Sequence, residues 1–349
     1  MSIAEDFVTN THPNIHLYQT GDEIIQIPED LLKIELVDRI KAVEQHTIKD
    51  LCTIQKDRFI FSDNSQYDGI LIEPDIRKYD IGHTLTTPWL TRTSGLNVYV
   101  GKIAAQEGIG TFEFSNEIAG VLTAAQNVGH VTLLHDAYVQ HLAINEIEKD
   151  GRFTENNWIN SGYSRGSMVG FGFNALAALF QREVVYSEFV DPCLEHKPNI
   201  SQLNPAVLGN YLANELTEMI KCASHYGLKD AWHLMKTLPL SPSEMIQHFA
   251  TMFALFSGEA GQLADMMPVD SSIYLKLYTG SIFNQADSWS NKFTDNFIKT
   301  KVTHELGYHS SGINPEVIKS SMARIAIIEE LFLDGATKED IDPNKIFKN

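Results

Sequence analysis

The chain has little of what marks metal-finger, secreted or membrane-spanning proteins. Only three of its 349 residues are cysteine, and no two of them form a Cys-x-x-Cys pair. This excludes a zinc knuckle and fits a reducing cytoplasm. The first residues, Met-Ser-Ile-Ala-Glu-Asp, show no signal peptide. The longest mainly apolar run, 168–180, is interrupted by glycine and asparagine and is too short for the roughly 20 residues of a membrane span.

Basic clusters and phosphate-binding motifs are also lacking. The net charge is -18, and such an acidic chain repels nucleic-acid backbones. No phosphate loop and no dinucleotide-binding glycine motif is present. By contrast, 43% of the residues are hydrophobic and 10% aromatic, which is ample for a buried core. We therefore expect a globular cytoplasmic protein with no nucleic-acid or membrane partner.

Hydrophobic periodicity predicts mainly helices. Apolar residues recur at helical spacing in several long segments, and Asn-Pro pairs or a capping box precede some of them. The predicted helices are 28–48, 112–148, 168–189, 204–226, 243–266, 284–308 and 314–335, with short ones at 229–236 and 270–277. Only 58–79 has a β-like pattern. The expected fold is an all-α multi-helix bundle at 111–335, with a mixed N-terminal region at 1–110 packed on it and a polar tail at 336–349.

One serine motif lies in a segment that is predicted to be a loop. Residues 162–166 read Gly-Tyr-Ser-Arg-Gly, but 151–165 is predicted to be a loop rich in Asn, Gly and Ser. Because no strand is predicted before the serine, we do not interpret the motif as a nucleophile elbow.

A metal site is the sharpest chemical prediction. Glu218 and His225 lie two helical turns apart on the predicted helix 204–226, so both leave the same side of it. Glu259 falls in the apolar wall of the next helix, where a lone charge is very costly. A solvated flank explains the first pair equally simply, and a buried ion pair explains Glu259.

Further candidate ligands precede the last helix. His304 continues an apolar line with Phe293 and Phe297, and Glu305 and His309 share a neighbouring line. A core histidine with satisfied hydrogen bonds is the simpler alternative for His304.

A rival set lies on the predicted helix 112–148. Glu117, His135 and Glu146 share one flank, and Asp136 lies within the apolar stripe. His141 points away from this flank and is expected to be solvated.

The first set resembles the haem-oxygenase-like dimetal oxidases. Glu218 and His225 match the first ligand pair of that family, Glu259 the middle acid, and His304, Glu305 and His309 the last-helix set. The family's last helix has the order His-x3-Asp/Glu-x2-His, whereas this chain has His-Glu-x3-His. The resemblance covers roughly the last 150 residues.

The resemblance implies a non-haem di-iron oxygenase. Two iron ions would activate O₂ to oxidise a C–H bond of a small substrate that bears a carboxylate, such as an amino acid. Arg165, Arg182 or Lys221 would bind that carboxylate. The alternatives are a non-catalytic helical binding or scaffold protein and a haem-dependent oxygenase. The sequence also allows a homodimer.

Overall fold

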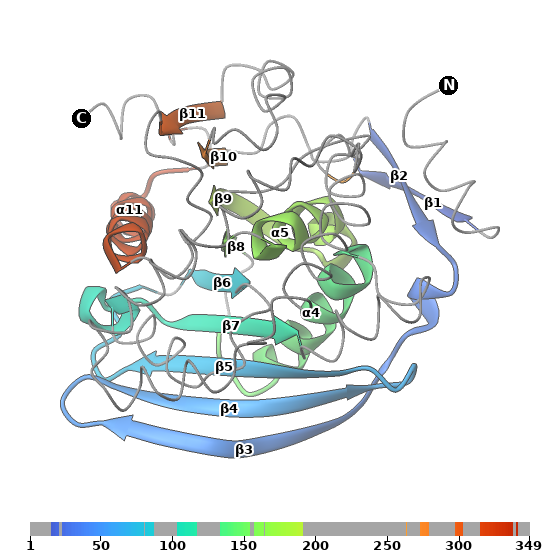
Figure 1. The fold of residues 1–349 in the computed structure, drawn as a ribbon, viewed down its shortest axis with the longest axis horizontal. Helices are drawn as coiled ribbons and strands as arrows, with labels where there is room; N and C mark the ends of the chain where they lie inside the picture. Colours follow the sequence, from blue (N-terminus) through green and yellow to red (C-terminus); the bar gives the residue numbers. More distant parts are fainter. Residues whose placement is uncertain are drawn as a thin grey trace, which may run out of the picture.

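The computed structural model describes residues 15–20, 23–79, 81–86, 103–116, 133–153, 157–163, 165–190, 263, 273–278, 297–302, 315–337 and 340. A nine-stranded sheet forms the centre of this part of the chain (Figure 1). In spatial order its strands are β11 (Phe297–Val302), β10 (Ile273–Tyr278), β9 (Glu183–Val190), β8 (Asn157–Tyr163), β6 (Gly82–Thr86), β7 (Thr111–Asn116), β5 (Gln66–Pro74), β4 (Cys52–Phe61) and β3 (Leu36–Ile48).

The sheet is mixed. The strands from β11 to β7 run parallel to one another, whereas β5, β4 and β3 each run antiparallel to their neighbour. A second, two-stranded antiparallel sheet pairs β1 (Ile15–Thr20) with β2 (Glu23–Pro28). Parallel neighbours need crossover connections, so this half of the sheet requires helices packed against its faces.

Alternation of side chains explains the antiparallel half. On β4, Phe59 and Phe61 point to one face and pack into the main core, whereas Cys52 and Ile54 point to the other. That second face also holds Ala105, from a short helical segment at 103–107. Because both faces are covered, the apolar residues of β4 and β5 are buried on both sides of the sheet.

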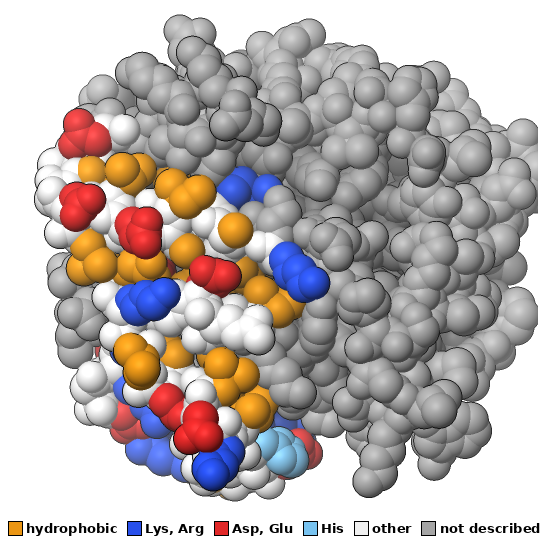
Figure 2. All heavy atoms as spheres, turned by 90° about the vertical axis from the view of Figure 1, so that its left-hand side faces the viewer, with side chains coloured by type: hydrophobic (Ala, Val, Ile, Leu, Met, Phe, Trp, Pro, Cys, Tyr) orange, Lys and Arg blue, Asp and Glu red, His pale blue; other side chains and the backbone are white. Residues whose placement is uncertain are grey.

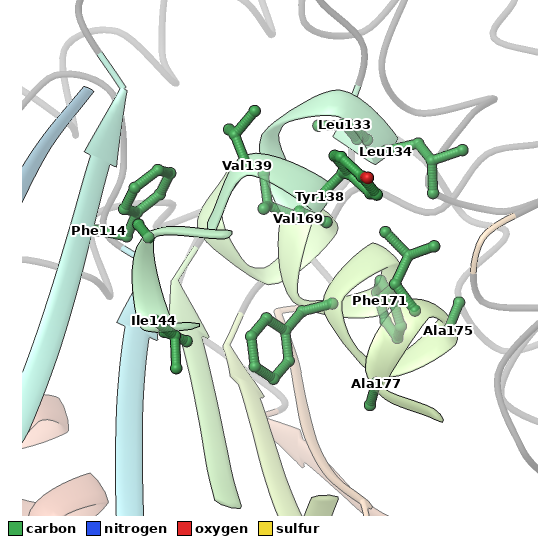
Figure 3. Packing of buried hydrophobic residues seen from close by; sticks show 14 of the residues in the cluster. Phe114, Leu133, Leu134, Tyr138, Val139, Ile144, Val169, Phe171, Ala175 and Ala177 are labelled. Atoms are coloured by element: carbon green, nitrogen blue, oxygen red, sulfur yellow. The ribbon is translucent and has the colours of Figure 1, made fainter. Parts of the chain in front are cut away.

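Two helices cover the first face. α4 (Leu133–Glu148) and α5 (Arg165–Leu176) lie against each other, and Figure 3 shows apolar side chains of both, with Phe114 of β7 on the α4 side. α4 ends before Gly151, whose φ of 76° suits glycine. α5 continues into a 3-10 turn, η2 (Ala177–Phe180), and a second such turn, η1 (Leu31–Lys33), precedes β3.

α11 (Pro315–Leu333) covers the opposite face. Ser187 of β9 accepts a hydrogen bond from Asn174 of α5, and the next residue, Glu188, pairs with Arg324 of α11. Successive strand residues point to opposite faces, so α5 and α11 lie on opposite sides of the sheet. The outer surface on this side mixes acidic, basic and hydrophobic side chains (Figure 2).

The expected all-α bundle is wrong. The described residues contain eleven strands, nine of them in one sheet, and three long α-helices, which are α4, α5 and α11. Segments 28–48, 270–277 and 284–308, which were predicted to be helical, contain β3, β10 and β11. Helix 314–335 is confirmed by α11, and the β-like pattern of 58–79 by β4 and β5.

Non-local pairing explains these errors. β11 is six residues long and pairs only with β10, about twenty residues earlier in the chain. Short strands of this kind gain their stability from a neighbour in the sheet, and hydrophobic spacing along one segment cannot report that. The predicted division into 1–110, 111–335 and 336–349 stays a prediction.

No helix within the described ranges is long and apolar enough to cross a membrane.

Candidate active site

The most unusual backbone feature joins β8 to α5. β8 ends at Tyr163 and α5 begins at Arg165, so a single residue, Ser164, separates strand from helix in the sequence. Ser164 itself lies outside the described residues. A strand that changes to a helix within one residue requires a sharp turn, which brings the backbone before and after it together.

Two glycines make this close approach feasible. A Cβ atom built on Gly162 would lie 2.5 Å from the carbonyl oxygen of Gly166 and 2.7 Å from the Cα of Ser167. These partners are backbone atoms that cannot move aside, so any side chain at Gly162 would push the helix away from the strand. The Ser167 hydroxyl donates a 2.6 Å hydrogen bond to the Gly162 carbonyl and closes the turn.

Buried polar side chains hold α5 against the sheet behind this turn. Asn160 of β8 donates to the Gly170 carbonyl at 3.0 Å and to the Asn174 side chain at 2.8 Å. Asn174 in turn donates to the Ser187 hydroxyl of β9 at 2.8 Å. These bonds tie α5 to two neighbouring strands, so the turn between β8 and α5 has a fixed base.

The carboxyl ends of the parallel strands meet at one edge of the sheet. Ser164 follows β8 directly, Asp191 follows β9 directly, and His304 follows β11 by two residues. In open α/β sheets, ligands bind outside this edge. Asp191 and His304 lie outside the described residues.

His83, on the central strand β6, is a buried structural histidine. Its Nδ1 lies 3.0 Å from the Thr111 hydroxyl and its Nε2 2.9 Å from the Ser161 hydroxyl. Burial lowers the pKa of the imidazole to about 3, so the ring is neutral.

Two members of the rival set, His135 and Asp136, are buried, and His135 pairs with the exposed Asp63. His135 is buried, with Nε2 2.6 Å from an Asp63 oxygen and Nδ1 3.1 Å from the Tyr67 hydroxyl. Tyr67 donates a 2.6 Å hydrogen bond to Asp136. Burial alone would lower the pKa of His135, but the carboxylates of Asp136 and Asp63 raise it to about 9. Glu146 bonds Lys149, and Glu117 lies outside the described residues.

The expectation that His141 is solvated is wrong. Its ring is fully buried and stacks between Phe173 and Phe180, with ring centroids 3.9 and 4.5 Å away. Arg182, a candidate for binding a substrate carboxylate, is also buried and instead bonds Glu148 at 2.7 Å and Asn145 at 2.6 Å. The other two candidates cannot be placed in the same way, because Lys221 and the side chain of Arg165 lie outside the described residues.

All the residues predicted as iron ligands lie outside the described residues: Glu218, His225, Glu259, His304, Glu305 and His309. Within the ranges that the structure describes, no group of three or more His, Cys, Asp or Glu side chains is placed to hold a metal ion.

Comparison with known proteins agrees with the sheet. No family model and no curated protein matches the chain. A crystal structure from Legionella pneumophila, of a protein described provisionally as a hydrolase, matches with a TM-score of 0.52 and 12% identity, over 85% of this chain and 98% of that chain. The peroxisomal alpha-beta-hydrolase of Saccharomyces cerevisiae matches with a TM-score of 0.49 and 12% identity, over 85% and 90% of the two chains. A Pyrococcus furiosus esterase also gives 0.49 and 12%, over 82% and 95%.

The likeness to the Legionella protein shows the fold, a mixed α/β sheet with helices on its faces. This corrects the sequence interpretation in several respects. The resemblance to haem-oxygenase-like dimetal oxidases is wrong, because that family is a helical bundle. The assignment as an oxygenase using two iron ions and O₂ falls with it, and so does the helical scaffold alternative. The haem-dependent oxygenase finds no support in this fold either.

The sequence did contain the signal for the turn. Gly-Tyr-Ser-Arg-Gly has glycine at both ends and serine in the centre, which is the pattern of a nucleophile elbow. The sequence does not predict the strand before this motif, and without that strand the motif does not indicate an elbow. That strand, Asn157–Tyr163, is rich in polar residues, and its Asn160 and Ser161 are buried and hydrogen-bonded.

Proposed function

We propose that the chain is a serine-dependent hydrolase that cleaves an acyl ester of a small molecule. The observation that carries this proposal is the contact of Gly162 with the backbone of Gly166, on either side of Ser164. Such a strand–serine–helix turn exposes the serine hydroxyl above the sheet and places the N–H of the next residue, here Arg165, to bind the oxyanion.

The proposed triad follows the chain order Ser, Asp, His of α/β-hydrolases. Ser164 is the nucleophile, His304 the general base, and Asp191 the carboxylate that orients His304. The three residues follow the carboxyl ends of β8, β11 and β9. Asp287, nine residues after β10, is the alternative residue for the carboxylate that orients His304, and it serves as the control for Asp191.

The reaction proceeds in two balanced steps. The Ser164 oxygen forms a bond to the acyl carbon, the ester C–O bond breaks, and His304 passes the serine proton to the departing alkoxide. Water then attacks the acyl-enzyme, and His304 returns a proton to the Ser164 oxygen as the acid departs. The reaction consumes water, and O₂ has no part in it. A cytoplasmic location and a homodimer stay predictions.

A serine-reactive fluorophosphonate tests the nucleophile directly. The serine oxygen would bond to phosphorus and fluoride would leave, which adds a fixed mass to one tryptic peptide. We expect labelling at Ser164 in the full chain and hydrolysis of p-nitrophenyl esters. Labelling and ester hydrolysis should both be lost in Ser164→Ala. Both should be retained in Ser62→Ala, a matched substitution of another serine on the turn after β4.

Substitutions of His304 and Asp191 test the other two members of the proposed triad. His304→Gln and Asp191→Asn should each lower the labelling rate by at least about 100-fold, while His309→Gln and Asp287→Asn should not. A wild-type chain that is neither labelled at Ser164 nor active on any of a set of short and long acyl esters would refute the proposal. Loss in Asp287→Asn rather than Asp191→Asn would reassign the carboxylate.

A further inference from the structure

β6 is the strand that leads into the segment after Thr86. In α/β-hydrolases the loop after the third strand of the fold gives the second N–H that binds the oxyanion. β6 occupies that position, because it lies between β8 and β7 and is parallel to both. The end of β6 lies beside the turn after β8, because Thr86 pairs with Gly162.

One buried side chain of α4 holds the end of β6. The Gln140 amide donates a 2.7 Å hydrogen bond from Nε2 to the Thr84 hydroxyl. The Thr86 hydroxyl donates a 3.2 Å hydrogen bond to Gln140 Oε1. Gln140 and Thr84 are fully buried and Thr86 is 3% exposed. Both ends of one amide are thus bound to the last residues of β6.

The register of the sheet places this contact at the level of the candidate active site. Thr86 pairs with Gly162 of β8, the first glycine of the serine turn. Thr84 pairs with Asn160, which itself is bonded to α5. Gln140 and the asparagine network therefore fix two neighbouring strands at the same height on the same face of the sheet.

We propose that Gln140 and Thr86 are positioning residues that hold the carboxyl end of β6 beside Gly162, the glycine that precedes the serine turn. They do not touch the substrate. A small displacement of a donor in a preorganised site lowers the rate strongly and changes ground-state binding little. This inference rests on the proposed function, since it concerns the reaction of Ser164.

The experiment compares pairs of variants by fluorophosphonate labelling of the full chain. Thr86→Val removes the hydroxyl at nearly constant shape, and Thr86→Ser keeps it. We expect the maximal labelling rate, kinact, to fall about tenfold in Thr86→Val with an unchanged KI, and to return to within about twofold of wild type in Thr86→Ser. Gln140→Met removes the same bond from the other side and should give the same loss.

Thr111→Val is the matched control. Thr111, the first residue of β7, is also buried and hydrogen-bonded, but its partner is His83. The Thr111→Val variant should lower the thermal midpoint as Thr86→Val does, but it should leave kinact unchanged. If Thr86→Val does not fold, Gln140→Met gives the same test. Moreover, the double variant Thr86→Val/Gln140→Met should lose no more than either single variant.

The outcomes separate this inference from the function beneath it. A wild-type chain that is not labelled at Ser164 refutes the proposed function. Labelling of the wild type at Ser164 with unchanged kinact in folded Thr86→Val and Gln140→Met overturns only the positioning role. An equal fall of kinact in Thr111→Val also overturns it, because the effect would then follow general stability.

Discussion

At the scale of single residues, buried charge is the main departure from a purely apolar core. Asp57 is fully buried and accepts hydrogen bonds from Arg39, Gln55 and the Ala42 backbone. These bonds fix the bulge at which Ala42 adopts a φ of 53°. Glu329 is buried beside Arg77, and burial raises its pKa well above the usual value. Such groups link the stability of the fold to pH.

His135 gives the clearest pH prediction. Its pKa in the folded chain is about 9, whereas it is 6.5 without the fold. The stabilisation by the protonated ring is therefore fully present below pH 6.5 and is lost as the pH rises through 9. We expect the free energy of unfolding to fall by on the order of 3 kcal/mol over this range in the wild type.

Urea unfolding at pH 6 and pH 9.5 measures this loss. His135→Gln should be less stable at pH 6 and should show a much smaller decrease towards pH 9.5. The control is His83→Gln, because the neutral His83 has a pKa of about 3 and does not titrate in this window. Equal pH dependence in wild type and His135→Gln would show that the ion pair with Asp63 and Asp136 is absent.

At the scale of elements, the sequence predicted what is local. Asn314-Pro315 and Gly335 set the ends predicted for the last helix, and Gly335 has a φ of 87° after α11. Gly151 likewise ends α4 where the sequence predicted a stop. The start of α4 was not predicted, because Thr111–Asn116 has apolar residues that also fit a helical stripe. In the structure this segment forms β7, an inner strand of the sheet.

The candidate site was missed for the same reason. β8 is recognisable as a strand only through its neighbours β6 and β9, which lie about seventy residues before it and twenty after it. Asn160 and Ser161 look like loop residues in the sequence. In the structure they are buried, and the Asn160 side-chain nitrogen and the Ser161 hydroxyl form hydrogen bonds with partners on α5 and β6. Without that strand, the serine motif has no structural context.

Gly162→Ala tests the turn between β8 and α5. The added Cβ would meet the Gly166 carbonyl oxygen at 2.5 Å, so the helix must shift away from the strand. We expect labelling of Ser164 to fall by at least about 100-fold, since an error of about 1 Å in position can cost that much. The thermal midpoint should also fall by several degrees.

Gly110→Ala is the control for this substitution. The three heavy atoms nearest to its Cβ would all belong to the Arg77 side chain, the first at 3.3 Å, and a side chain can adjust more easily than a backbone. This variant should be labelled at the wild-type rate. Normal labelling of Gly162→Ala would mean that the strand and helix do not approach as closely as the structure shows.

At the scale of the whole molecule, the last helix is tied to the centre of the sheet. Arg324 of α11 donates from Nε to Glu188 of β9 at 2.8 Å, and its Nη2 pairs with the other carboxylate oxygen. Glu188 is fully buried and lies 136 residues earlier in the chain. This ion pair is therefore one of the contacts that make the C-terminal helix and the parallel strands a single unit.

A double-mutant cycle measures that link. Arg324→Met removes the cation and leaves the Glu188 carboxylate buried. The neighbouring Tyr186 hydroxyl, 3.3 Å away, can still donate a hydrogen bond to it. We expect the free energy of unfolding to fall by about 3–5 kcal/mol, the usual cost of breaking a buried ion pair. The double variant Glu188→Met/Arg324→Met removes both charges and should recover most of this loss, as measured by urea unfolding. Additive losses from the two single substitutions would mean that α11 is held by its apolar face alone, through residues such as Met322 and Ile325, which are fully buried.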